Sequence, residues 1–262
     1  MAPRNKEQVA RQFSRAAFSY DQAAGIQQRA VTQLLDGLTS VSGHWLDIGC
    51  GTGVALPHLR HKGAESVTGI DMAEGMLEAA QQHADPQTTL LLADADSLPL
   101  DNDSIDGVFS SLMLQWSEDP QTTLREWRRV LRDDGQLAIA TLLPGTQREL
   151  QQAWRAVDER PHVNRFASQE ELTDALRVAG FTHIHTEQAC LQEHYAGMTE
   201  LLRRLKQIGA TNVNPGRREG LGGRAQLRLA EASYPVVNHS GATLYPLSYE
   251  VLWIYARAGD PT

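Results

Sequence analysis

Three glycines at alternate positions, directly after a short apolar run, form the segment of this sequence best suited to bind a ligand through the backbone. The run and the glycines read WLDIGCGTG at 45–53. Glycine permits a sharp turn and lets a ligand approach where a Cβ would exclude it. The spacing differs from the G-x-G-x-x-G of dinucleotide sites, and no Walker lysine follows, which disfavours a nucleoside triphosphate. The candidate ligand-binding residues here are Asp47, Gly49, Cys50, Gly51 and Gly53.

Two more acids follow the next two apolar runs of the chain. Asp71 comes directly after the run at 66–70, and Asp94 after the run at 88–93. A carboxylate at such a strand end accepts hydrogen bonds from ribose hydroxyls, or from an exocyclic adenine amine. Asp47, at the end of the first run, can lie near a cationic amino-acid group. Each acid alone is commonly a helix cap or a turn residue. Three of them at successive strand ends predict a site for a ligand that carries adenosine.

The elements that would position these residues alternate between strands and helices. Helical patterns separate seven expected strands, which predicts an α/β fold with a doubly wound, mostly parallel sheet. Ser168 and Glu171 form a capping-box pattern before one of these helices. The strands are expected at 44–48, 66–70, 88–93, 104–110, 135–142, 181–190 and 247–257.

The glycine loop and the three strand-end acids resemble the class I S-adenosylmethionine-dependent methyltransferases. This resemblance implies a Rossmann-like sheet of seven strands whose last strand is antiparallel, with S-adenosyl-L-methionine as the cofactor. It assigns the methionine part to Asp47 and the loop glycines, the ribose to Asp71, and the adenine to Asp94 with Ala95. Tyr20 is expected to close over the cofactor. The other cofactor contacts that it implies are Met72 and Ser111, and it places Gln115 and Trp116 between cofactor and substrate.

The chain is expected to divide into four parts. They are an N-terminal helical cap at 1–42, the α/β domain at 43–190, a helical lid insertion at 191–246 and the final strand at 247–262. Loops of this length are uncommon unless they carry a function. From 201 to 230 the lid insertion carries seven basic residues and one acid, although the whole chain has a net charge of −8. This indicates either an anionic partner or a solvated helical surface.

The flanks at 9–24, 201–212 and 246–251 are similar to the malonyl-acyl-carrier-protein O-methyltransferases of biotin synthesis. Together with the core, the resemblance spans nearly the whole chain. It implies methyl transfer to the free carboxylate of a malonyl thioester, on acyl carrier protein or on coenzyme A. That carboxylate is ionised at neutral pH, so no catalytic base is expected. The implied substrate and carrier contacts are Arg15, Tyr20, Gln115, Trp116, Arg203, Arg204, Lys206 and Arg217. Arg15, Arg203 and Arg217 remain unranked as partners of the malonyl anion.

The composition of the chain excludes or disfavours several other classes of protein. The chain has 262 residues and two cysteines, which excludes a disulfide framework and favours a cytoplasmic protein. No apolar run is long enough to span a bilayer, no metal motif occurs, and the net acidity disfavours a nucleic-acid partner. Three alternatives stay open. They are a methyltransferase that acts on a free small carboxylate or a quinone-like ring, a non-catalytic S-adenosylmethionine-binding module, and a nucleic-acid methyltransferase.

Overall fold

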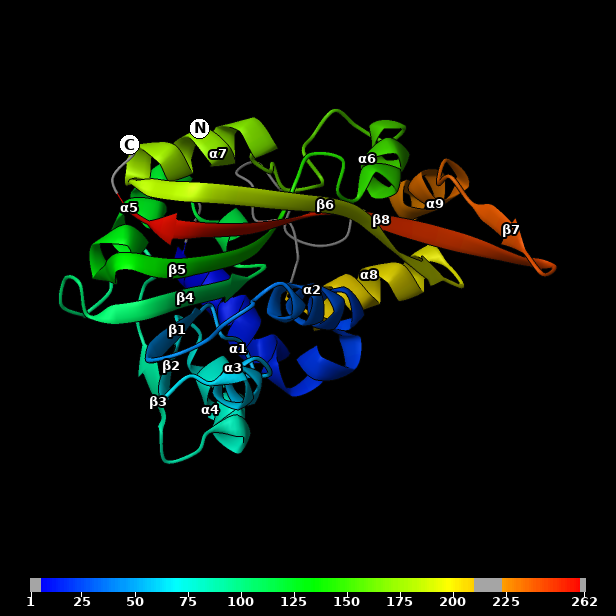
Figure 1. The fold of residues 1–262 in the computed structure, drawn as a ribbon. Coiled ribbons are helices and arrows are strands. Elements are labelled where there is room, and N and C mark those ends of the chain that lie inside the picture. The colour runs from blue at the N-terminus through cyan, green and yellow to red at the C-terminus, as the bar shows by residue number, and fades with distance from the viewer. Residues whose placement is uncertain (1–5, 210–222, 260–262) are drawn as a thin grey trace.

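The computed structural model describes residues 6–209 and 223–259, and its centre is a twisted sheet of eight strands (Figure 1). Seven strands run in the order β3-β2-β1-β4-β5-β8-β6, and β7 pairs with the outer end of β8. The first five strands are parallel, and β8 is antiparallel to β5, β6 and β7. The strands are β1 His44–Ile48, β2 Ser66–Asp71, β3 Thr88–Leu92, β4 Ile105–Ser111, β5 Leu131–Leu142, β6 Phe181–Tyr195, β7 Val237–His239 and β8 Ala242–Ala258. The predicted doubly wound, mostly parallel sheet is confirmed.

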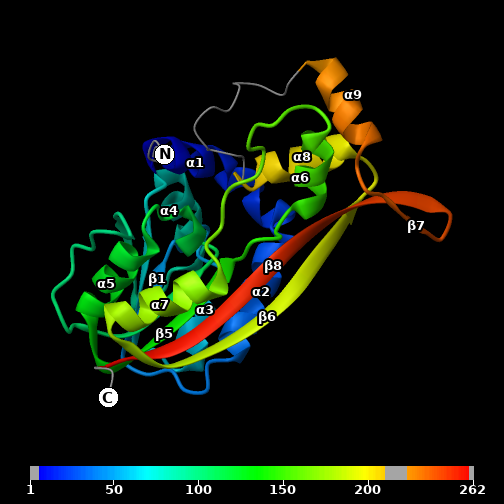
Figure 2. The ribbon, with the colours of Figure 1, turned by 90° about the horizontal axis from the view of Figure 1, so that it is seen from above.

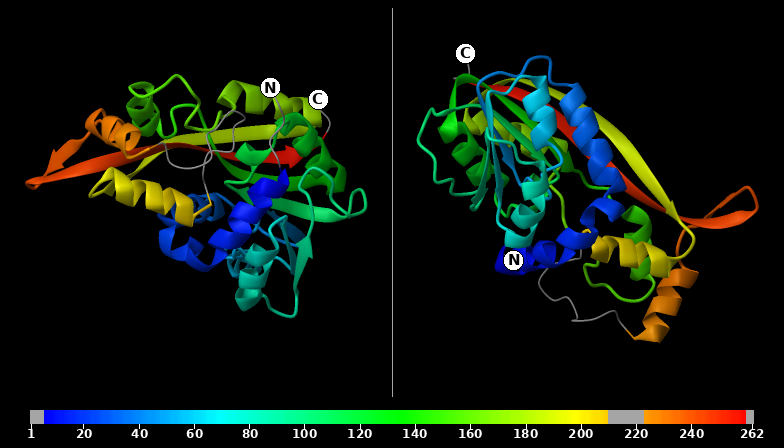
Figure 3. Two further views of the ribbon diagram at one scale, coloured as in Figure 1. Left: turned by 180° about the vertical axis from the view of Figure 1, so that it is seen from behind. Right: turned by 90° about the horizontal axis from the view of Figure 1, so that it is seen from below.

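Helices cover both faces of this sheet (Figures 1 and 3). α2 to α4 lie on one face and α5 and α7 on the other, while α6, α8 and α9 gather near the outer part of β6 and β8. α1 packs against α4 and α8 at the carboxyl edge of the sheet. None of the helices within the described ranges is long and apolar enough to cross a bilayer. The helices are α1 Lys6–Ala23, α2 Gly25–Asp36, α3 Leu56–Lys62, α4 Glu74–Ala80, α5 Pro120–Val130, α6 Arg148–Arg155, α7 Gln169–Ala179, α8 Met198–Gln207 and α9 Arg224–Ala232, with 3-10 turns η1 Gln81–His83 and η2 Leu114–Trp116.

The α2 helix is anchored to the sheet by its apolar stripe. Ile26, Ala30 and Leu34 recur at a four-residue spacing and are at most 1% exposed. The indole Nε1 of Trp253, on β8, donates a hydrogen bond of 3.0 Å to the Ala30 carbonyl. An isolated helix of this length is marginal in water, so burial of the stripe stabilises it. The start of α2 is thereby held above the carboxyl end of β1.

Two strands are longer than the sequence pattern predicts. β6 continues to Tyr195 and β8 begins at Ala242, so five residues at each end of the expected lid insertion lie in strands. Together they form a ribbon that projects beyond the other strands and ends in the β7–β8 hairpin (Figure 2). Gln192, Glu193 and His194 interrupt the apolar pattern there, yet each pairs with a residue of β8. Backbone pairing, which does not depend on side-chain polarity, accounts for the extension.

Removal of the Ser168 hydroxyl is expected to destabilise α7 without affecting ligand binding. The Ser168 Oγ accepts the Glu171 N–H at 3.1 Å, and a Glu171 carboxylate oxygen accepts the Ser168 N–H at 2.7 Å, as the capping-box pattern predicts. Ser168→Ala leaves one helix N–H without this acceptor, which costs about 1 kcal/mol in the free energy of unfolding. Urea denaturation measures this change. A matched Thr173→Ala variant, inside the same helix, is the control.

Candidate active site

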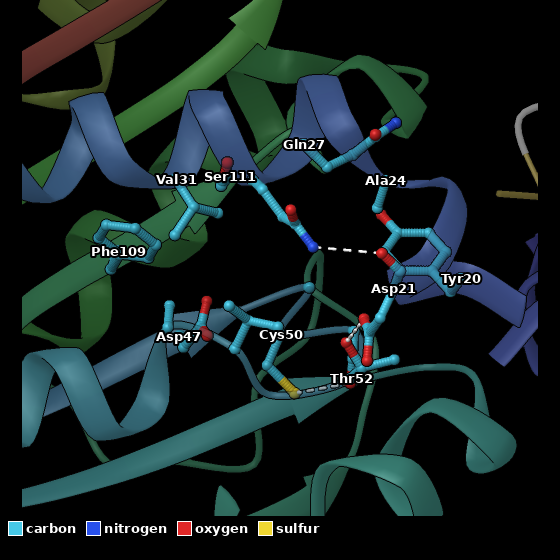
Figure 4. A pocket seen from close by; sticks show the side chains of 15 residues that line it. Tyr20, Asp21, Ala24, Gln27, Val31, Asp47, Cys50, Thr52, Phe109 and Ser111 are labelled. Carbon is cyan, nitrogen blue, oxygen red and sulfur yellow. Dashed lines mark hydrogen bonds between the residues drawn. The ribbon is translucent and has the colours of Figure 1, made fainter. Parts of the chain in front are cut away.

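A pocket lies at the carboxyl ends of β1 and β4 and opens beneath the junction of α1 and α2 (Figure 4). Its floor is the glycine loop after β1, and Phe109 and Ser111 of β4 form one wall. The opposite wall comes from the two N-terminal helices. Open α/β sheets bind ligands in this position, outside the carboxyl ends of their strands. The lining side chains therefore come from three segments that are far apart in the sequence.

Backbone hydrogen bonds hold the glycine loop in shape. The N–H groups of Gly49 and Cys50 both donate to the Ile70 carbonyl, at 2.7 and 2.9 Å. The Gly51 N–H donates to one carboxylate oxygen of Asp71 at 2.9 Å, and the Ala73 N–H donates to the other at 2.8 Å. Asp71 therefore positions the loop as well as the start of α4. Each of its oxygens retains a lone pair that can accept a ribose hydroxyl.

The three loop glycines have positive φ angles but different surroundings. Their φ values are +72° at Gly49, +54° at Gly51 and +83° at Gly53. A Cβ on Gly49 would overlap the Met113 side chain, and one on Gly53 would lie 2.9 Å from the Ala80 Cβ. A Cβ on Gly51 would have nothing within 4 Å. Gly49 and Gly53 thus permit close packing inside the protein, whereas Gly51 borders open space.

The carboxylate of Asp47 lies in the pocket wall and is buried from solvent. Burial raises its pKa to about 8, and the nearby Asp71 carboxylate adds to this effect. The same causes hold the pKa of the Cys50 thiol above its ordinary value, so Cys50 is a neutral thiol and a poor nucleophile. Burial also raises the pKa of Tyr20, followed by the charges of Asp71 and Asp21. The site therefore holds a phenol and a buried acid that a cationic ligand would ionise.

One buried polar atom in this wall has no partner within the protein. Among the described residues, the Ser111 Oγ is the buried side-chain oxygen or nitrogen that makes no hydrogen bond. An unsatisfied buried hydroxyl is costly, and such groups commonly mark a ligand position. With the Asp47 carboxylate and the open space above Gly51, it offers an acceptor, a charge and room for an amino acid's ammonium and carboxylate. These residues fit the methionine part of S-adenosylmethionine.

Helix α1 covers the whole length of the expected cofactor site. At its start, the Lys6 ammonium lies 2.6 Å from one carboxylate oxygen of Asp94 and 2.6 Å from Asp96. At its end, Asp21 accepts a hydrogen bond of 2.6 Å from the Thr52 hydroxyl in the glycine loop. Tyr20 lines the pocket beside it. α1 therefore spans from the expected adenine end to the methionine end.

The structure brings six of the expected cofactor residues into the pocket and leaves five outside its wall. The six are Tyr20, Asp47, Gly49, Cys50, Gly51 and Ser111. Outside it, Asp94 is paired with Lys6, and the Ala95 carbonyl accepts the Trp127 indole N–H at 3.1 Å. The other residues outside the wall are Gly53, Asp71 and Met72. The described pocket thus gathers the residues that are expected to hold the methionine part, and the roles of all eleven residues remain predictions.

Of the expected substrate residues in the described ranges, Tyr20 lines the pocket and the others lie outside its wall. Trp116 is half-buried, and its ring meets that of Phe13 edge-on at 5.3 Å, so it packs against α1. The Gln115 amide donates to the Leu112 carbonyl at 2.6 Å. Arg15 lies on the exposed face of α1. On α8, Arg203 and Lys206 are exposed, whereas Arg204 donates to the Gln22 carbonyl at 2.8 Å. Arg217 lies outside the described residues.

The sequence analysis did not predict the part of the pocket wall that is formed by α2 and by Ala24, the residue before it. Ala24, Gln27, Gln28 and Val31 line the pocket and recur at spacings of three and four residues, which is a helical face. That face lies next to the buried stripe of α2. An apolar face wider than this stripe was the sequence signal that could have predicted these pocket residues. Thr52 and Asp21 were missed because their hydrogen bond joins segments 31 residues apart. No group of three or more metal-ligating side chains occurs in the described ranges.

Comparisons with known proteins identify the family of this chain. A methyltransferase-domain family model matches residues 46–139. A malonyl-acyl-carrier-protein O-methyltransferase of Hamiltonella defensa is 38% identical over 252 residues, which is 95% of this chain and 93% of the relative. The biotin biosynthesis bifunctional protein BioHC of Cellvibrio japonicus is 37% identical over 95% of this chain, which spans only 50% of that relative. The crystal structure of a methyltransferase-like protein from Bacillus halodurans matches with a TM-score of 0.63 at 17% identity, over 88% of this chain and 99% of the other.

The likeness to the Bacillus halodurans structure concerns the fold alone, because the sequences are only 17% identical. The alignment with the relative from Hamiltonella defensa covers nearly all of both chains. The family model begins on β1 and ends on β5, and so includes the glycine loop and the strand-end acids. The match to the relative also includes most of the flanking helices. On this evidence, the chain belongs to the malonyl-acyl-carrier-protein O-methyltransferase family.

Proposed function

We propose that this chain transfers the methyl group of S-adenosylmethionine to the free carboxylate of a malonyl thioester carried by acyl carrier protein. The observation that carries the proposal is the pocket wall in which the buried Asp47 carboxylate, the unpartnered Ser111 hydroxyl and the space above Gly51 meet. The name of the relative from Hamiltonella defensa supplies the acceptor. Esterification would remove the malonyl charge, as a biosynthesis that elongates an apolar-ended primer requires.

The pocket residues would perform binding and alignment rather than proton transfer. When bound, the cofactor supplies an electrophilic methyl group on a sulfonium. Asp47 would pair with its ammonium, and Ser111 would hydrogen-bond to its amino-acid part. The acceptor carboxylate has a pKa near 4 and is already an anion at neutral pH, so no side chain needs to remove a proton. Catalysis would then come from holding a carboxylate oxygen, the methyl carbon and the sulfur in line.

The neutral groups in the wall suit this reaction. Because Tyr20 stays a phenol and Cys50 a thiol, neither competes with the acceptor carboxylate for the methyl group. Helix α1, fastened to the glycine loop through Asp21 and Thr52, would exclude water that solvates the acceptor. In this scheme the cap at 1–42 closes the cofactor site, and the lid insertion at 191–246 faces the carrier. We place the reaction in the cytoplasm, in line with the two unpaired cysteines.

Charge reversal on α8 is expected to slow turnover of carrier-bound substrate. Arg203 and Lys206 are exposed, whereas Arg204 holds α8 to α1 and would confound the test. Acyl carrier proteins are acidic, so Arg203→Glu with Lys206→Glu should lower kcat/KM for malonyl carrier protein about tenfold, with a smaller effect at high salt. Turnover of malonyl-CoA should fall less. Arg177→Glu on α7 is the matched control, and equal losses on both substrates would remove the docking argument.

Mass spectrometry tests the reaction itself. Malonyl carrier protein incubated with the enzyme and cofactor should gain the mass of one methyl group, and mild ester hydrolysis should reverse the gain. Free malonate and a quinone-like ring, offered in the same assay, should remain unmodified. Methylation of a free acid without methylation of the thioester would instead support an enzyme acting on small carboxylates.

A further inference from the structure

The outward face of α1 carries an aromatic side chain that the fold leaves in solvent. Phe18 is 98% exposed, and the other large apolar side chains exposed in the described ranges reach at most 58%. The helix already has a buried face, because Ala16 and Ala23 are buried and Phe13 packs against Trp116. Phe18 therefore contributes almost nothing to the core. An exposed aromatic ring at a defined position commonly marks a contact with another molecule.

Two basic side chains share the exposed face of α1 with this ring. Arg11, Arg15, Phe18 and Gln22 are spaced by four, three and four residues, so they share one face of α1, and all four are exposed. Helix α8 lies alongside, since the Ser19 hydroxyl donates to the Gln207 carbonyl at 3.2 Å and Arg204 donates to the Gln22 carbonyl. α8 therefore adds its own cations to this surface. We call the surface formed by Arg11, Arg15, Phe18, Gln22, Arg203 and Lys206 the docking face.

The acids on these two helices do little to neutralise the docking face. Glu7 lies at the start of α1, where its carboxylate is 3.7 Å from Arg11 in a largely exposed pair. Asp21 turns inward to accept from Thr52, and the Glu200 carboxylate accepts the Ala196 N–H at 2.9 Å. On these two helices the four cations Arg11, Arg15, Arg203 and Lys206 thus outnumber the one exposed acid, Glu7, although the chain as a whole has a net charge of −8. A local potential opposite to the net charge selects an acidic partner.

We propose that the docking face receives the acidic surface of acyl carrier protein, with Phe18 as its apolar anchor. This inference rests on the proposed function and extends it from the lid insertion to the N-terminal cap. A second copy of this chain is a poor occupant, because a two-fold interface would set the same arginines against each other. Interface energy concentrates in a few aromatic and arginine side chains, and Phe18 between Arg15 and Gln22 has that composition.

The position of the docking face also suits delivery of a tethered substrate. Tyr20 and Asp21, two and three residues after Phe18, line the pocket on the inner side of the same helix. A carrier held on the outer side would thus lie across α1 from the cofactor site. Because Asp21 accepts a hydrogen bond from Thr52 in the glycine loop, α1 links the docking face to this loop.

Truncation of the ring tests this docking face. Phe18→Ala should lower kcat/KM for malonyl carrier protein about tenfold or more, mainly through KM, as expected for loss of an interface anchor. Because the ring is in solvent, the melting temperature and the affinity for S-adenosylmethionine, measured by calorimetry, should stay unchanged. Turnover of malonyl-pantetheine, which lacks the carrier, should also stay unchanged. Val178→Ala, which removes a 58% exposed side chain from α7 on the other face of the sheet, is the control.

The outcomes of this experiment distinguish failure of the docking proposal from failure of the proposed reaction. If the wild-type chain methylates malonyl carrier protein and Phe18→Ala does so with unchanged KM, the docking face is wrong and the reaction stands. If the wild-type chain methylates no malonyl thioester, the proposed function itself fails. If Phe18→Ala instead abolishes self-association in sedimentation experiments, or binding to anionic vesicles, without changing carrier turnover, the face serves a second copy or a lipid surface and the proposal is overturned.

Discussion

Asp47→Asn is expected to weaken S-adenosylmethionine binding at least a hundredfold while it stabilises the protein without cofactor. Loss of one partner from a buried charge pair costs about 3–5 kcal/mol, which corresponds to this change in affinity. The amide is isosteric but cannot supply the negative charge that the cofactor's ammonium requires. Calorimetric titration measures the binding, and thermal unfolding measures the stability. A variant that binds the cofactor normally would contradict the assignment of this pocket.

The stabilisation follows from the raised pKa of Asp47. Its value is about 8 in the folded protein, against a reference near 3.9 for the unfolded chain. The folded state therefore keeps the proton longer, and the free energy of unfolding falls as the pH rises from about 4 to about 8. Asparagine carries no such charge, so the variant should be more stable than the wild type at pH 8, with the difference vanishing near pH 4.

Cofactor binding should depend on pH for the same reason. Below pH 8 the unliganded Asp47 is protonated, and it must release this proton to pair with the ammonium. The affinity of the wild type should therefore rise as the pH increases from 6 to 8, with proton release upon binding, and the affinity of Asp47→Asn should be flat over this range. Titration in buffers of different ionisation enthalpy detects the released proton. A flat wild-type profile would show that Asp47 is already ionised.

Gly51→Val is expected to abolish cofactor binding because the valine side chain would occupy the space of the ligand. A valine at Gly241 serves as the matched control for backbone strain. A side chain at Gly51 meets no protein atom within 4 Å and enters the open space of the pocket. The substitution also strains the backbone, because φ is +54° there, at a cost of about 1–2 kcal/mol. Gly241, in the β7–β8 hairpin, has φ +81°, and a Cβ on it would likewise have nothing within 4 Å.

Gly241→Val therefore carries a similar backbone strain at a site remote from the pocket. Both variants should lose stability in urea denaturation, but only Gly51→Val should fail to bind S-adenosylmethionine. Equilibrium dialysis with labelled cofactor compares the two at a temperature where both are folded. Equal binding by the two variants would mean that the ligand does not occupy the space above Gly51.

Local patterns were sufficient for the elements that carry the glycine loop. β1 and β2 lie within one residue of the ranges expected from their apolar runs, and the Ser168 capping box forms as its spacing predicts. In these segments the strand signal is strong, because a parallel strand that is buried on both faces reads as a continuous apolar run. The outer halves of β6 and β8 carry polar residues, and their strand structure depends on pairing with each other.

The amino-acid sequence by itself determined the class of sheet, the glycine turn after Ile48 and the acids at three strand ends, since each follows from residue type and neighbours along the chain. Only the tertiary structure decided which of these groups share a pocket, because α1 lies across the loops after β1 and β3 and pairs Lys6 with Asp94 and Asp21 with Thr52. The raised pKa of Asp47 and the exposure of Phe18 belong to the same category. Both depend on which distant segments exclude water from a side chain, and no local pattern encodes that.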